Sequence, residues 1–108
     1  MRYEVLLTAK AERDLESIRA YVSERDSPAS ADRILDLLLG MVETLEQFPE
    51  RGSHPREALA LGYREYRQIV HKPWRMCYRV VQRRVYIALI ADCRRDMRTL
   101  LSQRLLGA

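Results

Sequence analysis

One segment near the end of the chain is apolar on both of its faces, and this feature constrains the fold more than any other. The segment runs from Val85 to Asp92. In an extended conformation it has apolar side chains on one side (Val85, Ile87, Leu89, Ala91) and on the other (Tyr86, Ala88, Ile90). A strand with this pattern is buried on both faces, so we expect it to be central in a sheet.

Two further strand-like segments precede it. Tyr63 to Val70 ends at His71-Lys72-Pro73, and Trp74 to Val81 ends at Gln82-Arg83-Arg84. The spacing predicts a meander of hairpins. The second segment alternates between one face (Trp74, Met76, Tyr78, Val80) and another (Arg75, Cys77, Arg79, Val81). This alternation predicts a half-buried strand whose second face carries cations.

The first part of the chain predicts a strand and then a helix. Arg2 to Leu7 alternates as a strand does. Thr8 fits the N-cap of a helix that ends at about Arg25. The apolar residues at helical spacing are Ala11, Leu15, Ile18 and Val22, with Glu12, Arg13, Glu16 and Arg19 on the solvated side.

A second helix is predicted after Asp26. Ser27 would be its N-cap and Pro28 its first residue. Apolar residues then recur at intervals of three and four, up to Phe48, and Pro49 ends the helix. We expect the two helices to form an antiparallel hairpin against the sheet. The spacing also permits a short coiled coil, although the segment is too short to favour one.

The remaining segments complete an α+β domain. Residues 49–62 are expected to be a loop, because they hold two prolines and two glycines. Met97 to Leu106 has helical spacing, and Gly107 would be the C-cap. The predicted fold is therefore an N-terminal strand, a helical hairpin on a mainly antiparallel sheet, and a C-terminal helix.

Length and composition limit the function classes. The chain has 108 residues, the size of a single domain spanning 1–108. We see neither an apolar run of about 18 residues nor a signal peptide, so we expect a cytoplasmic protein that does not contact a membrane. The two cysteines, Cys77 and Cys93, are expected to be free thiols. The two histidines lack metal-ligand spacing, and we expect no metal or cofactor.

Charge is divided unevenly along the chain. Residues 1–62 hold 8 Lys/Arg and 12 Asp/Glu, a net charge of −4, whereas residues 63–108 hold 11 Lys/Arg and 3 Asp/Glu, a net charge of +8. A half this basic indicates an acidic or phosphate-bearing partner. The alternative is a surface on which arginines serve solubility.

Several of these segments together resemble the RelE/ParE superfamily of bacterial toxins. The matching residues are Phe48-Pro49-Glu50-Arg51-Gly52, Tyr66-Arg67, Trp74-Arg75-Met76-Cys77-Tyr78-Arg79-Val80, Val85 to Ile90 and Arg94-Arg95-Asp96. The resemblance covers nearly the whole chain. It implies the toxin of a type II toxin–antitoxin system and the α+β fold already predicted from the residues.

The resemblance implies two alternative activities. RelE-like toxins cut messenger RNA on the ribosome, and ParE-like toxins inhibit DNA gyrase by binding it. Arg75 and Arg95 match arginines that RelE-like toxins use in catalysis. The second strand lacks the lysines of that branch, however, and the last helix lacks its tyrosine. We expect Tyr78 in the core and His71 on the surface, which leaves no convincing acid/base pair.

The end of the last strand favours the ParE-like branch. In that branch a short segment ending in Arg-Asp precedes a leucine-rich helix, as Arg95-Asp96 does here. A purely structural role for Asp96, as the cap of that helix, is compatible with this resemblance. Without a histidine partner, Cys93 is not expected to act as a nucleophile.

The sequence therefore predicts a gyrase inhibitor that stabilises plasmids, arrests growth when free and forms a hetero-oligomer with a cognate antitoxin protein. The alternative partners are the ribosome and messenger RNA. A third possibility is a degenerate member that binds only its antitoxin or DNA. The residues expected to bind antitoxin or target are Arg67, Arg75, Arg79, Arg94 and Arg95. Apolar antitoxin side chains are expected to fill a groove of the helical hairpin.

Overall fold

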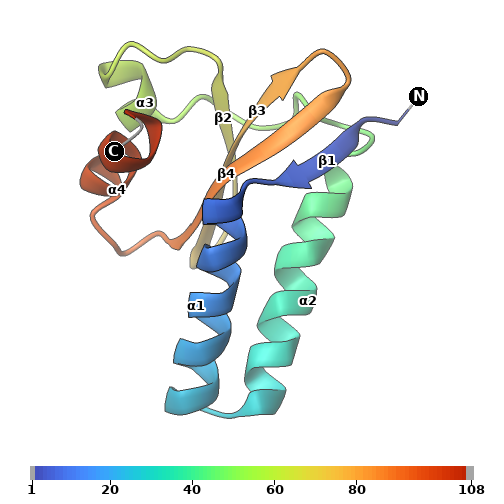
Figure 1. The fold of residues 1–108 in the computed structure, drawn as a ribbon, viewed down its shortest axis with the longest axis vertical. Helices are drawn as coiled ribbons and strands as arrows, with labels where there is room; N and C mark the ends of the chain where they lie inside the picture. The colour runs from blue at the N-terminus through green and yellow to red at the C-terminus, as the bar shows by residue number, and fades with distance from the viewer. Residues whose placement is uncertain (1, 107–108) are drawn as a thin grey trace.

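The computed structural model describes residues 2–106, and its centre is a four-stranded sheet (Figure 1). The strands are β1 (Glu4–Leu7), β2 (Tyr66–His71), β3 (Trp74–Val81) and β4 (Arg84–Asp92), in the order β1-β4-β3-β2. The β1 strand is parallel to β4, and the other neighbours are antiparallel. The doubly apolar β4 lies inside the sheet, which confirms its predicted central position.

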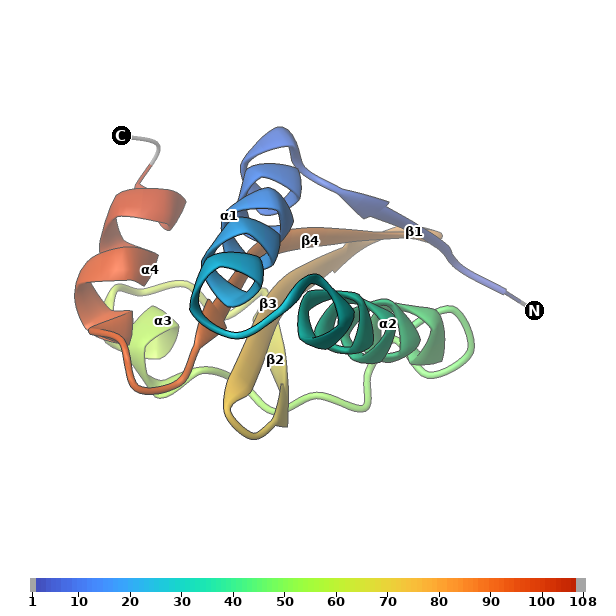
Figure 2. The same cartoon turned by 90° about the horizontal axis from the view of Figure 1, so that it is seen from below.

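Two helices form the predicted antiparallel hairpin on one face of this sheet. They are α1 (Ala9–Arg25) and α2 (Pro28–Thr44), and Figures 1 and 2 show them side by side. Both predicted N-caps are confirmed. The backbone N–H of Ala11 donates to Thr8 Oγ1 at 3.1 Å, and that of Ser30 donates to Ser27 Oγ at 3.1 Å. The caps satisfy N–H groups that have no partner within the first turn.

The main core lies between the helical hairpin and the sheet. It includes Ala11, Leu38, Met41, Leu45, Ile69, Met76, Tyr78, Val85, Ile87 and Ile90. Every second residue of β3 belongs to this face, as its alternation predicts.

The opposite face of the sheet is also covered, over part of its area. The covering helices are α3 (Arg56–Ala60) and α4 (Met97–Leu105), which lie together at one end of the molecule (Figure 2). Met97 and Leu101 of α4 pack on Cys77, Leu89 and Ala91. The prediction that β3 is half-buried is therefore wrong for its first half. Arg75 on that face is only 9% exposed.

Element boundaries differ from the predictions at several places. The β1 and β2 strands begin at Glu4 and Tyr66 rather than at Arg2 and Tyr63. The α2 helix ends at Thr44 rather than Phe48, because Leu45 turns into the core and is fully buried while Phe48 is 63% exposed. The backbone N–H of Tyr3 then donates to Glu46 O at 2.8 Å, which ties this turn to the start of β1. The predicted loop at 49–62 contains the five-residue helix α3.

A bulge and an ion pair connect the last strand to the last helix. The register between β3 and β4 shifts between Cys77 and Tyr78, which leaves Ala88 of β4 unpaired. Arg104 of α4 donates to the Ala88 carbonyl oxygen at 2.7 Å and to both carboxylate oxygens of Asp14 in α1. Asp96 caps α4, since its Oδ1 accepts from the N–H of Thr99 at 3.2 Å. The predicted cap at Gly107 lies outside the described residues.

Candidate functional site

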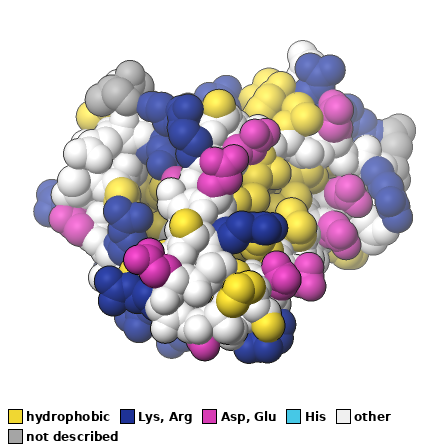
Figure 3. Space-filling model, turned by 60° about the horizontal axis from the view of Figure 1, so that its bottom comes forward, with side chains coloured by type: hydrophobic (Ala, Val, Ile, Leu, Met, Phe, Trp, Pro, Cys, Tyr) yellow, Lys and Arg dark blue, Asp and Glu magenta, His cyan; other side chains and the backbone are white. Residues whose placement is uncertain are grey.

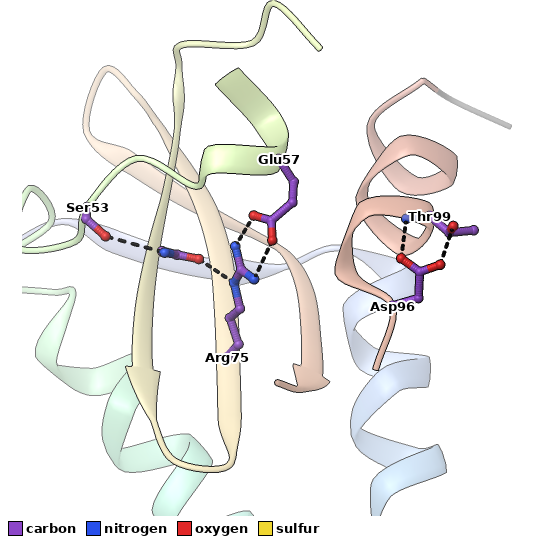
Figure 4. A network of polar contacts seen from close by, with 6 residues as sticks. Ser53, Glu57, Arg75, Asp96 and Thr99 are labelled. Carbon is purple, nitrogen blue, oxygen red and sulfur yellow. Dashed lines mark hydrogen bonds and ion pairs between the residues drawn. The ribbon is translucent and has the colours of Figure 1, made fainter. Parts of the chain in front are cut away.

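Arg75 lies at the centre of a polar network that joins three elements and a loop (Figure 4). Its two terminal nitrogens donate to the Glu57 carboxylate of α3, at 3.1 and 2.5 Å. Its Nε donates to Gln68 Oε1 of β2, and Gln68 Nε2 donates to Ser53 Oγ at 3.4 Å. The guanidinium thus forms a bidentate pair, which is the strongest geometry for an Arg–carboxylate contact.

The Glu57–Arg75 pair is shielded from water. The side chains are 26% and 11% exposed, respectively. The hydrogen bond from Arg75 holds the pKa of Glu57 below its ordinary value. Glu57 is therefore ionised at neutral pH, and Arg75 has its charge neutralised inside the protein. The sequence did not identify Glu57 as this partner, because α3 was not predicted.

Tyr78 is fully buried, as expected. Its hydroxyl oxygen accepts a hydrogen bond from the N–H of Gly52 at 3.1 Å, and burial raises the pKa of the phenol. His71 is exposed at the end of β2, also as expected. His54 is exposed as well, with Nδ1 3.0 Å from the carbonyl oxygen of Tyr66. These proton carriers do not form hydrogen bonds with Arg75.

The other predicted binding arginines are spread over the molecule. Arg67 donates to the carbonyl oxygens of Glu50 and Gly52, at 3.2 and 2.8 Å, and so fixes the loop before α3. The guanidinium carbon of Arg79 lies 5.9 Å from the centre of the Tyr66 ring. In β3, Arg79 has the same parity as Arg75, whereas Arg67 pairs in register with Tyr78 on the core side. Arg67 and Arg79 therefore lie on opposite faces of the sheet.

Arg94 and Arg95 follow β4 and lie near each other at its end. Arg94 is 81% exposed in its side chain and forms an ion pair with Asp92 at 2.5 Å. The hydrogen bond from Arg94 lowers the pKa of Asp92, with a smaller contribution from the charge of Arg95. Arg95 is exposed. Of the five arginines, only these two line the same cleft.

An apolar groove of about 580 Å³ runs between α1 and α2. Its apolar residues are Leu15, Leu35 and Leu39, and Leu39 is 45% exposed. Four carboxylates (Glu12, Glu16, Asp32, Asp36) and Arg19 line the groove as well. Figure 3, which brings the helical hairpin forward, shows apolar surface flanked by acidic and basic side chains. The groove therefore carries an excess of negative charge.

The two cysteines are not joined in a disulfide. Cys77 is buried and Cys93 is partly buried, and both are free thiols. Burial raises the pKa of Cys77 to about 12. Within residues 2–106, no three His, Cys, Asp or Glu side chains are grouped so that they could hold a metal ion.

Comparison with known families shows the family to which the chain belongs. Residues 5–97 match the family described as the ParE toxin of the type II toxin–antitoxin system parDE. The chain belongs to the ParE toxin family. This ParE-family chain is accordingly a toxin of the type II toxin–antitoxin class, as the resemblance implied.

Solved structures show the same fold. The chromosomal ParDE system of P. aeruginosa aligns with a TM-score of 0.71 at 22% identity, covering 83% of this ParE-family chain and 95% of that chain. The RelBE2 toxin–antitoxin complex of Mycobacterium tuberculosis gives 0.63 at 23% identity, covering 85% and 99%. A mutant of the E. coli toxin RelE in the free state gives 0.64 at 14% identity, covering 99% and 98%.

Two further comparisons complete the description. A search of curated proteins gives no match. Among the described helices of the ParE-family chain, none is long and apolar enough to cross a membrane.

Proposed function

We propose that this toxin inhibits DNA gyrase by binding it and does not cut RNA. The observation that carries the proposal is the neutralisation of Arg75 by Glu57. An RNA-cleaving site needs a cation that can stabilise the charged phosphorane, together with groups that accept and donate protons. Here the guanidinium already holds a carboxylate at 2.5 and 3.1 Å.

Proton transfer would also lack a suitable group near Arg75. Tyr78 is in the core with a raised pKa. Glu57 is close to Arg75, but its lowered pKa makes it a weak base. Membership in the ParE family supports the same conclusion.

Two assays with the purified toxin test the proposal. The toxin should inhibit plasmid supercoiling by gyrase and trap gyrase-cleaved plasmid. Ribosomes programmed with messenger RNA should show no new cuts in the decoding site.

The alternative function is that of a RelE-like ribosome-dependent ribonuclease. It is favoured by the match of Arg75 and Arg95 to that branch and by the fold shared with RelE.

Arg75→Ala separates the two activities. In a ribonuclease, loss of this guanidinium should slow cleavage by about a hundredfold or more. Arg64→Ala is a matched control, since Arg64 is an exposed arginine outside the network. Ribosome-dependent cleavage by the wild type that is lost in a folded Arg75→Ala protein, but kept in Arg64→Ala, would establish the ribonuclease and exclude our proposal.

We also propose that a cognate antitoxin neutralises the toxin in a hetero-oligomer. Its binding segment is an amphipathic helix whose apolar side chains fill the groove between α1 and α2. Because that groove carries excess negative charge, the residues beside the apolar stripe are basic. Acidic residues of the same antitoxin meet Arg67 and Arg79. Arg75 contributes only if Glu57 is displaced from it. The RelBE2 relative is itself a toxin–antitoxin complex, which supports an antitoxin partner.

A further inference from the structure

A second apolar cleft lies on a different face of α1, beside the end of β4. It has a volume of about 440 Å³. Ile18, Trp74 and Ile90 contribute apolar lining, and Tyr21 lines it while remaining 58% exposed. Cavities of this size, roughly 300–1,000 Å³, accept small ligands or large anchoring side chains. Neither Arg75 nor any residue that lines the α1–α2 groove lines this cleft.

The charge pattern of this cleft differs from that of the α1–α2 groove, because two aspartates and two arginines line it. The two carboxylates that line it are already engaged. Asp14 accepts from Arg104 and from the N–H of Ile90, and Asp92 accepts from Arg94. Arg95 forms no hydrogen bond or ion pair with another side chain of residues 2–106, and it lies close enough to Asp92 to help lower its pKa. One positive charge therefore remains uncompensated.

A further cation lies next to the exposed tyrosine. The guanidinium carbon of Arg25 lies 4.7 Å from the centre of the Tyr21 ring. The cleft thus combines tryptophan, tyrosine and arginine, the three residue types most enriched at the energetic centres of protein interfaces. Its apolar lining, together with Arg95 and Arg25, complements a protein segment that carries one apolar or aromatic residue next to Asp or Glu.

We propose that this cleft is the surface with which the toxin docks on gyrase. An apolar or aromatic anchor residue of gyrase enters between Tyr21 and Trp74, and an adjacent carboxylate pairs with Arg95. The proposal rests on the gyrase inhibition proposed above, and it names the residues and the chemistry that achieve it. Gyrase and antitoxin then occupy separate faces of α1. One cleft offers Arg95 without a carboxylate partner among residues 2–106, whereas the lining of the other carries an excess of negative charge.

Charge reversal and truncation at the cleft test this assignment. Arg95→Glu and Tyr21→Ala should each weaken gyrase binding by about tenfold or more, which corresponds to about 1.4 kcal/mol, because a few residues at such centres supply most of the binding energy. Arg64→Glu reverses an exposed charge elsewhere and should change affinity by less than about twofold. The readouts are direct binding to gyrase and inhibition of supercoiling, with circular dichroism to confirm that each variant folds.

Photo-crosslinking identifies the contact independently of affinity. A benzoylphenylalanine at position 21 should crosslink to gyrase within an acidic segment, and the same group at position 39, in the α1–α2 groove, should not. Inhibition of supercoiling by the wild-type toxin tests the proposed gyrase inhibition alone, so it is independent of the assignment of the docking cleft.

Three outcomes are decisive. If the wild type inhibits gyrase but Arg95→Glu and Tyr21→Ala inhibit equally well, the docking site is wrong and the proposed function stands. If the wild type neither binds nor inhibits gyrase, both proposals fail. If position 21 crosslinks to the antitoxin and not to gyrase, the cleft belongs to the antitoxin and the assignment to gyrase is overturned.

Discussion

Arg75 shows that the role of a side chain depends on partners that its own strand does not reveal. The alternation of β3 correctly placed Arg75 and Cys77 on one face, but it predicted that this face meets solvent. Glu57, 18 residues earlier, covers Arg75 from a short helix. The sequence therefore predicted the face of β3 on which Arg75 lies but not what covers that face, because the covering helices are distant along the chain.

Removing only one member of the Glu57–Arg75 pair should be costly. We expect Glu57→Ala to lower the free energy of unfolding by about 1–3 kcal/mol, since it leaves a mostly buried guanidinium without its carboxylate. The double variant Glu57→Ala/Arg75→Met should recover part of this loss. Urea denaturation of the wild type, both single variants and the double variant gives the coupling energy. Strictly additive losses would contradict the bidentate pair.

The same pair predicts a pH dependence of stability. The pKa of Glu57 is lowered in the folded state from a reference of 4.5. A depressed folded-state pKa contributes stability that is present above the unfolded value and is lost as pH falls through the folded value. Stability should therefore decline below about pH 4.5, and Glu57→Gln should decline less steeply there than the wild type. Equal slopes in denaturation series between about pH 5 and about pH 2.5 would contradict this expectation.

The two thiols should differ in reactivity. Burial raises the pKa of Cys77 to about 12, so the unreactive thiol form dominates at neutral pH. Cys93 is only partly buried. We expect a thiol reagent to label Cys93 alone in the native protein and both residues after denaturation, as mass spectrometry can show. Cys77→Ala/Cys93→Ser should retain toxicity, and its complete loss in a folded protein would reveal an unrecognised thiol chemistry.

At the scale of elements, the loop before α3 is fixed by a close approach of backbone to β2. A Cβ at Gly52 would lie 2.5 Å from the carbonyl oxygen of Gln68 and 2.7 Å from the Tyr78 hydroxyl. The N–H of Gly52 also donates to that hydroxyl. These contacts explain why a glycine stands at this position.

Two glycine substitutions with opposite expected effects test this packing. Gly52→Ala should destabilise the protein by about 2 kcal/mol or more, because the first contact is with backbone that cannot rotate away. Gly40→Ala is the control, since a Cβ there meets nothing within 4 Å and the residue lies inside α2. It should stabilise by about 0.5–1 kcal/mol. The measurement is the melting temperature of each variant relative to the wild type. A shift of both melting temperatures in the same direction would contradict the packing argument.

Every element of the fold except the short helix α3 was predicted from the sequence. The β3 strand has its predicted bounds, and both hairpin helices begin at the predicted caps. The α3 helix has five residues and no side-chain cap, so neither periodicity nor capping indicated it. The end of α2 was misplaced because Leu45 and Phe48 both fit the apolar spacing, and only the tertiary packing determines which one is buried. The carboxylate partner of Arg75 was missed for a related reason, since Glu57 belongs to the helix that was not predicted.

At the scale of the whole molecule, the toxin offers two clefts with different charge patterns, and the α1–α2 groove carries the excess of negative charge. This predicts that the antitoxin complex depends on the α1–α2 groove. Leu39→Lys should weaken antitoxin binding by about tenfold or more, because it places a charge where an apolar side chain is expected. Leu59→Lys is the control, since Leu59 is 44% exposed in α3 and Leu39 is 45% exposed. Calorimetric titration of both variants with the antitoxin measures the difference, and equal affinities would exclude the groove.

The pairing of β1 with β4 has a consequence for synthesis of the protein. Glu4 pairs in register with Arg84, and their side chains form an ion pair across 80 residues of sequence. The sheet therefore cannot close until the ribosome has released β4. At about 5–20 residues per second, the first strand and the helical hairpin wait several seconds with their apolar faces uncovered. The cleft beside β4, on which the proposed action on gyrase depends, likewise forms only after β4 and Arg95 have left the ribosome.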